Sequence, residues 1–166
     1  MSPKEHVVYG AAASAAAFPF WGPIGAVSFF LGSVFIDIDH YLDYLYFSRF
    51  RNWSVKDMFA FHGQMARWKD RDDFLALEAF HTAEFLLAFL AVGLYFESAP
   101  LLLFFSGMIF HLGLDLVRLQ SYGRVSVRAL SFIEYWVRAG RMRRSGIDPE
   151  GLFRQAYEKI TAKNRD

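Results

Sequence analysis

Apolar and polar residues are separated into long blocks along this chain. Residues 7–36 contain no formal charge, and the segment "FPFWGP" (18–23) places two prolines and a glycine in the middle of that run. Proline breaks a helix because it has no backbone N–H and its ring clashes with the preceding turn. The run therefore predicts a helical hairpin with legs at about 3–18 and 23–46, and with Ser2 as its N-cap.

A second hairpin is expected on the same plan. Its legs would cover about 73–96 and 100–119, with Asp72 or Asp73 as the N-cap and "ESAP" (97–100) as the turn.

The segments outside the hairpins have an amphipathic pattern. In the link, Ser54 with Asp57 predicts a short helix whose apolar face carries Met58, Phe59, His62 and Met65. Two further amphipathic helices are expected at 127–144 and 149–162. The chain is thus predicted to be one all-α domain, 1–166, whose parts are hairpin one (1–46), a polar link (47–72), hairpin two (73–120) and amphipathic C-terminal helices (121–166).

Composition narrows the classes of function. The chain is 54% hydrophobic and 19% aromatic with a net charge of +1, which argues against nucleic acid as a partner. It has no cysteine, so disulfides and thiolate metal sites are excluded. The N-terminus has no Leu-rich centre and its Lys4 is cancelled by Glu5, so it reads as a helix start rather than a signal peptide.

The basic residues favour a membrane. Each purely apolar stretch is only about 12–14 residues, which is typical of buried core helices, so a soluble helical domain is the alternative. However, all 18 Lys and Arg lie in the N-terminal tip, in the link or beyond Leu116, and the two turns contain none. This distribution predicts a multi-pass, membrane-embedded four-helix bundle with its termini and link in the cytoplasm. The C-terminal helices would lie on the membrane surface through Arg138, Arg141, Arg143 and Arg144.

Acids and histidines from all four legs are expected at similar depth. Counted at about 1.5 Å per residue, they lie roughly 17–26 Å from the turn of their hairpin. They are His6, Asp37, Asp39, His40, His81, Glu84, His111 and Asp115. Within helices, spacings of three or four residues place such pairs on one face.

Carboxylates beside an apolar block are costly unless something positive neutralises them, and no Lys or Arg is available at that level. One or two divalent metal ions would do so. Taken singly, the motifs have simpler interpretations: "DIDH" as a solvated helix end, His111 with Asp115 as a buried pair, and His6 as a surface histidine. We expect His62 to pack or form a lid rather than bind metal.

The order of these motifs resembles the predicted inner-membrane metal-dependent hydrolases, sometimes called LexA-binding. The resemblance covers about residues 4–120 and rests on an early histidine, "DIDH", a histidine opening the third helix and "GMIFHLGLD". It implies an inner-membrane location and a metal site at His6, Asp37, Asp39, His40, His81, His111 and Asp115. The His-x-x-x-Asp pattern is also distantly similar to that of zinc-dependent phospholipases C and nucleases, which implies a phosphoester substrate.

We therefore predict a hydrolase with a zinc-type site, iron or manganese being possible, that acts on a lipid-like or other small phosphoester through a metal-activated water. Glu84 or Asp39 would be the general base. One alternative is an oxidative di-iron enzyme, because Asp37-x-x-His40 and Glu78-x-x-His81 imitate di-iron ligand pairs. Another is a non-catalytic membrane anchor with a structural metal layer, whose Arg-rich C-terminal part binds a protein partner.

Overall fold

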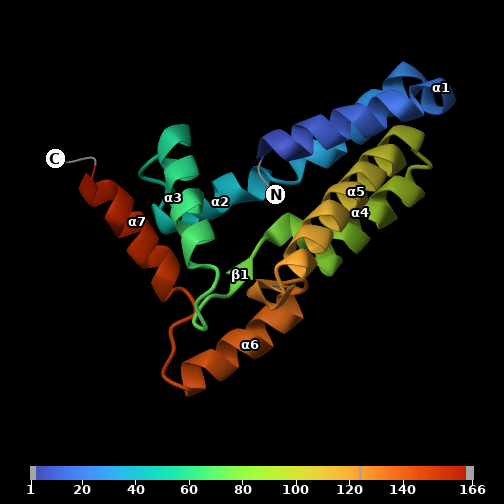
Figure 1. The fold of residues 1–166 in the computed structure, drawn as a ribbon. Helices are drawn as coiled ribbons and strands as arrows, with labels where there is room; N and C mark the ends of the chain where they lie inside the picture. Colours follow the sequence, from blue (N-terminus) through green and yellow to red (C-terminus); the bar gives the residue numbers. More distant parts are fainter. Residues whose placement is uncertain (1–2, 124, 164–166) are drawn as a thin grey trace. The chain divides into compact units, whose positions relative to one another are not determined.

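The computed structural model describes residues 3–123 and 125–163 and is mostly helical, which confirms the all-α class (Figure 1). The helices are α1 (Pro3–Phe35), α2 (Ile38–Phe47), α3 (Val55–Trp68), α4 (Ala83–Tyr95), α5 (Ala99–Ser121), α6 (Phe132–Arg144) and α7 (Gly151–Lys163). Two-residue strands, β1 (Ala76–Leu77) and β2 (Arg128–Ala129), pair in parallel. The chain forms two compact units: unit 1 is Met1–Asp37 with Phe80–Val125, and unit 2 is Ile38–Ala79 with Ser126–Asp166.

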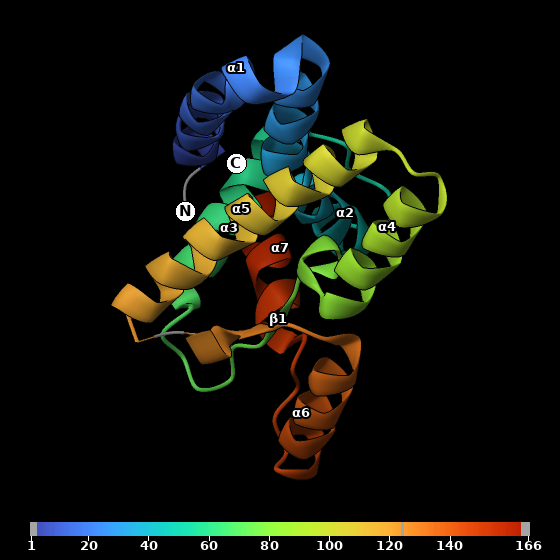
Figure 2. The ribbon, with the colours of Figure 1, turned by 90° about the vertical axis from the view of Figure 1, so that its right-hand side faces the viewer.

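Unit 1 begins with the predicted hairpin, which lies within α1. Gly22 has a φ of 64° and a ψ of −176°, a conformation that reverses the helix direction and that glycine adopts without a Cβ clash. The Ser14 hydroxyl donates to the Ala26 carbonyl across the two legs at 2.6 Å. The predicted turn at 18–23 is confirmed, and Figure 2 shows the two legs of α1 side by side. The Ser2 N-cap lies outside the described residues.

The second hairpin of unit 1 is formed by α4 and α5, but its first leg is shorter than predicted. The expected start at residue 73 is wrong: α4 begins at Ala83, and Thr82 is its N-cap, accepting from the Phe85 N–H at 3.4 Å. Asp73 does not cap a helix, because its carboxylate binds the Arg71 guanidinium at 2.9 Å. The intervening residues form β1 and a 3₁₀ turn, Ala79–His81.

The two hairpins meet where glycines allow the backbones to touch. A Cβ on Gly32 of α1 would overlap the Phe104 carbonyl of α5, and one on Gly107 of α5 would overlap the Phe29 carbonyl of α1. Beside this contact, Ile36, Leu86 and Met108 form a small buried cluster. Close packing through small residues is typical of helices in membranes.

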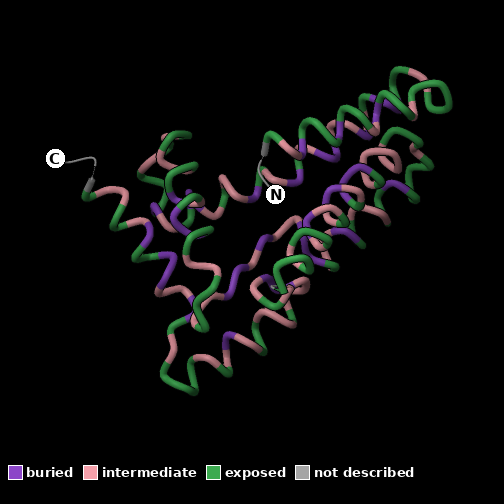
Figure 3. The backbone as a smooth tube through the Cα atoms, in the orientation of Figure 1, coloured by how far each residue is buried: buried purple, intermediate pink, exposed green. Residues whose placement is uncertain are grey.

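The long apolar helices are buried over only part of their length. Two helical segments, Lys4–Phe47 and Ala99–Ser121, are long and apolar enough to cross a membrane, with mean hydropathies of 1.5 and 1.8. Only 33% and 22% of their apolar windows are buried, and exposed positions alternate with buried ones along these helices (Figure 3).

Unit 2 has its own core, in which α2, α3 and α7 pack around Tyr44, Phe61 and Leu152. The link helix α3 is confirmed, with the Ser54 hydroxyl accepting from the Asp57 N–H at 3.1 Å. Its predicted face is partly wrong, because Phe61 is buried and Phe59 is exposed.

Three other helix boundaries differ from those predicted. The leg expected at 23–46 is interrupted at residues 36–37, where α1 ends before α2 begins. The helix expected from 127 begins at Phe132, because residues 125–129 form a 3₁₀ turn and β2, and Ser131 caps α6. The last helix begins at Gly151.

Candidate metal centre

Five of the predicted site residues meet in unit 1, and they come from separate pieces of chain. His6 lies in the first turns of α1, and Asp37 lies in the turn that follows that helix. His81 ends the 3₁₀ turn before α4, while His111 and Asp115 lie one turn apart on α5. The hairpins thus bring together residues separated by up to 109 positions in sequence, His6 and Asp115.

The donor atoms of these residues lie close enough to share an ion. His6 Nε2 lies 3.1 Å from Asp115 Oδ1, and His111 Nε2 lies 3.2 Å from Asp37 Oδ1. His111 Nε2 is also 3.7 Å from Asp115 Oδ2, and His81 Nε2 is 3.8 Å from Asp37 Oδ1. Ligands at about 2.0–2.1 Å around one tetrahedral ion lie about 3.3 Å apart, so these spacings fit a common centre.

The candidate ligands form two overlapping groups of three. One is His6, Asp37 and His111, and the other is His81, His111 and Asp115; within each group the potential ligand atoms lie within 4.8 Å of one another. The histidine rings also touch: His6 stacks on His111 with ring centroids 3.6 Å apart, and His81 meets His111 edge to face at 5.3 Å. These buried groups could hold a metal ion.

The orientation of His111 is set by a backbone group. Its Nδ1 lies 2.7 Å from the Ser33 carbonyl oxygen, which can only accept, so Nδ1–H is the donor. Ser33 lies in the last turn of α1, where carbonyls have no partner within the helix. With Nδ1 bound to this carbonyl, Nε2 faces Asp37 and Asp115. Such a carbonyl partner on the far nitrogen is the usual support of a metal-binding histidine.

Burying these carboxylates costs free energy unless a cation is buried with them. His81 and His111 are fully buried, as is nearly all of His6 and Asp115, and His6 Nδ1 has no hydrogen-bond partner. The sequence has no Lys or Arg between Glu5 and Ser48 or between Asp72 and Val117. The nearest basic residues in sequence, Lys4 and Arg118, are exposed. Two carboxylates that face imidazoles in a buried site need a proton or a metal ion between them.

The donor set itself suits a divalent ion. It offers imidazole nitrogens and carboxylate oxygens and no thiolate, which is compatible with zinc, iron or manganese. The predicted pairing of His111 with Asp115 on one face of α5 is confirmed by their distance. His6 is buried in the centre, so its alternative interpretation as a surface histidine is wrong.

The other three predicted residues do not join the two ligand groups. Glu84 lies half-buried in the first turn of α4, three residues after His81, and neither group of described residues includes it. Asp39 and His40 belong to unit 2. The proposed di-iron pairs are divided in the same way, because His40 and Glu78 belong to unit 2, while Asp37 and His81 belong to unit 1.

Within unit 2, the histidine and acids form a polar cluster of a different kind. His40 Nδ1 lies 3.9 Å from Asp39 Oδ1 and 3.8 Å from Glu78 Oε1. Glu78 also forms an ion pair with the buried guanidinium of Arg128, so this cluster contains its own fixed positive charge. Near the centre in unit 1, by contrast, the closest basic residues in sequence, Lys4 and Arg118, are exposed.

His62 serves the packing of unit 2. Its Nε2–H donates to the His40 carbonyl at 2.6 Å, and its ring lies against those of His40 and Phe61. Burial lowers the pKa of the His62 imidazole to about 4, and the neighbouring His40 ring adds to this effect. His62 is in neither of the two ligand groups of the described residues.

Sequence reasoning missed Ser33, because its contribution is a backbone oxygen that its residue type does not reveal. Its place in the last turn before Asp37 is the one available signal. Comparisons of the chain with protein-family models, with curated proteins and with solved structures give no match. The family resemblance therefore stays a prediction from the motifs.

Proposed function

We propose that this chain is a membrane-bound, metal-dependent hydrolase that acts on a phosphoester carried by a lipid. The observation that supports this best is the convergence of three histidines and two aspartates in unit 1, around a His111 Nε2 that faces both carboxylates. Intramembrane acids and histidines that cluster in this way mark functional sites.

The membrane location rests on the hairpins and on the basic residues. Two long apolar segments have only 33% and 22% of their apolar windows buried, and lipid would cover the apolar surface that remains. With both turns free of Lys and Arg, the positive-inside rule gives a multi-pass inner-membrane protein whose termini, link and metal centre are on the cytoplasmic side. The four hairpin legs would form the embedded bundle, and the arginines of α6 would meet anionic headgroups.

We assign two roles to the residues of this centre, metal ligand and general base. Bound at this centre, a zinc-type ion supplies a water whose pKa is lowered to about 7 and polarises the scissile oxygen. His6, Asp37, His81, His111 and Asp115 would hold it, with Ser33 fixing the His111 ring. Glu84 is our choice of general base, because it is in unit 1, close to His81 in sequence, and outside both ligand groups.

Metal analysis of the purified protein tests the first half of the proposal. We expect one or two equivalents of a divalent ion, and His81→Ala should lose at least one equivalent while keeping its helical content. His62→Ala is the matched control, since it removes a histidine that is outside both ligand groups. Equal metal content in wild type and His81→Ala would contradict the assigned centre.

Hydrolysis of a panel of soluble and lipid phosphoesters tests the second half. Glu84→Gln should keep the metal and lose about 100- to 10,000-fold in rate, the usual contribution of a general base. A metal-loaded protein that is inactive on the whole panel, and that unfolds on chelation, would indicate a structural metal in a membrane anchor. Iron with oxygen-dependent absorbance would instead favour an oxidative enzyme.

A further inference from the structure

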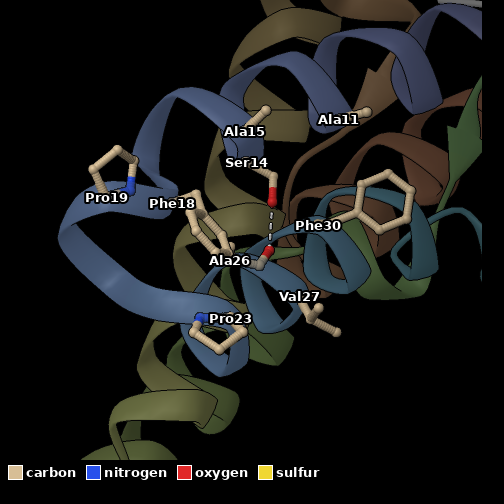
Figure 4. Close-up of a pocket in the computed structure, with 9 residues that line it drawn as sticks. All are labelled: Ala11, Ser14, Ala15, Phe18, Pro19, Pro23, Ala26, Val27 and Phe30. Atoms are coloured by element: carbon tan, nitrogen blue, oxygen red, sulfur yellow. Dashed lines mark hydrogen bonds between the residues drawn. The ribbon is translucent and has the colours of Figure 1, made fainter.

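A groove with a volume of about 580 Å³ lies between the two legs of the α1 hairpin, in unit 1 (Figure 4). Its lining combines small side chains with larger apolar ones. The lining residues are Ala11, Ser14, Ala15, Phe18, Pro19, Pro23, Ala26, Val27 and Phe30.

The groove offers no free polar side chain. Ser14 is the one polar residue among those that line it, and its hydroxyl already donates to the Ala26 carbonyl at 2.6 Å (Figure 4). No charged residue occurs between Val7 and Ile36. A sugar, nucleotide or peptide placed here would lose its hydrogen bonds to water without replacement, whereas a hydrocarbon chain would lose nothing. The chemistry of the lining therefore selects an alkyl occupant.

The shape of the groove suits a single chain. On the first leg its residues recur at three- and four-residue steps from Ala11 to Pro19, so the groove follows the helix axis for about 12 Å. A slender, flexible hydrocarbon chain can lie along a groove of this length.

The groove leads toward the candidate metal centre. Ala11, at one end of the first leg's lining, is five residues from His6, or about 7.5 Å along the helix. On the second leg, Phe30 lines the same end, and the leg continues to Phe35, two residues before Asp37. One end of the groove is thus near the end of the hairpin that carries two of the metal-centre residues.

We propose that this groove binds the acyl chain of a lipid whose polar head is held at the metal centre, an inference that rests on the function proposed above. The groove would then determine chain-length preference, because a long chain fills it and a short one leaves its far end at Phe18 and Pro23 empty. Ala15 would be a specificity-determining position, since its methyl group keeps the groove open on the exposed side of the leg.

The test uses a photoactivatable palmitic acid and the full-length protein in nanodiscs. In the wild type, covalent adducts should concentrate on residues 11–30 and be displaced by palmitic acid far better than by hexanoic acid. Ala15→Trp fills the groove and should reduce these adducts about tenfold, the equivalent of roughly two buried methylene groups. Ala16→Trp, on the same leg but outside the lining, should leave them unchanged.

Two results would overturn the groove assignment: adducts spread evenly over the outer faces of α4 and α5, or equal labelling of Ala15→Trp and Ala16→Trp. If Ala15→Trp loses helical content, Ala11→Trp with Ala12→Trp as control repeats the comparison one turn away. Labelling does not depend on hydrolysis. A labelled but inactive wild type would refute the hydrolase and keep the groove, whereas an active wild type without groove adducts would refute the groove alone.

Discussion

The histidines of the two units have different surroundings. In unit 1, His6, His81 and His111 face carboxylates, and the nearest arginine in sequence, Arg118, is exposed. In unit 2, His62 faces a backbone carbonyl and aromatic rings. The first environment favours a cation, and the second favours a neutral ring.

The neutral state of His62 makes a prediction about pH. The unfolded chain takes up a proton on His62 near pH 6.5, whereas the folded protein does so only near the lowered pKa of about 4. Between these two pH values the unfolded state binds more protons than the folded state. The free energy of unfolding therefore decreases as the pH falls from about 6.5 to 4, and His62 contributes up to about 3 kcal/mol to this decrease. Thermal unfolding across this pH range measures the effect.

His62→Gln is the control for that measurement. Glutamine can still donate to the His40 carbonyl but does not titrate, so this variant should depend less steeply on pH than the wild type. Parallel curves for the two proteins would show that other groups dominate.

At the scale of helices, the contact between α1 and α5 positions the residues of the candidate metal centre. Gly107 lies one turn before His111, and Gly32 immediately precedes Ser33. Because these glycines let the backbones touch, the Ser33 carbonyl reaches His111 Nδ1 at 2.7 Å. A larger residue at either position would separate the helix that carries His111 and Asp115 from the helix that carries His6.

Gly107→Ala should therefore weaken both the fold and the site. The new methyl group would overlap the Phe29 carbonyl, and overpacking of this kind costs about 1–3 kcal/mol. We expect a lower melting temperature and a lower metal content. Gly113→Ala on the same helix meets nothing within 4 Å and should be neutral or stabilising by up to about 1 kcal/mol. Equal loss of metal in both variants would contradict the role of the close contact.

The helices also show what local sequence can and cannot predict. Pro19, Gly22 and Pro23 specify the first hairpin by their own backbone chemistry, so its turn was predictable. The late start of α4 was not, because residues 76–77 pair with residues 128–129, more than fifty positions away. Likewise, counting residues from each turn predicted that the acids and imidazoles of the two hairpins lie at similar depth. It could not predict that the Ser33 carbonyl orients His111.

At the scale of the whole chain, the proposed topology places the two hairpin turns on the side opposite the termini and link. The protein has no cysteine, so single cysteines report their side of the membrane without interference. Glu97→Cys, in the exposed second turn, should react with a membrane-impermeant maleimide from the periplasmic side. Lys56→Cys, exposed at the start of α3, should react only after the membrane is permeabilised. Equal labelling of both cysteines in intact cells would refute this topology.

The chain leaves unit 1 at Asp37 and returns to it at Phe80, next to His81. An ion bound by Asp37 and His81 would link the end of the first segment of unit 1 to the start of the second. Losing that ion should loosen these ends first, while the glycine-packed middle of the hairpins stays ordered.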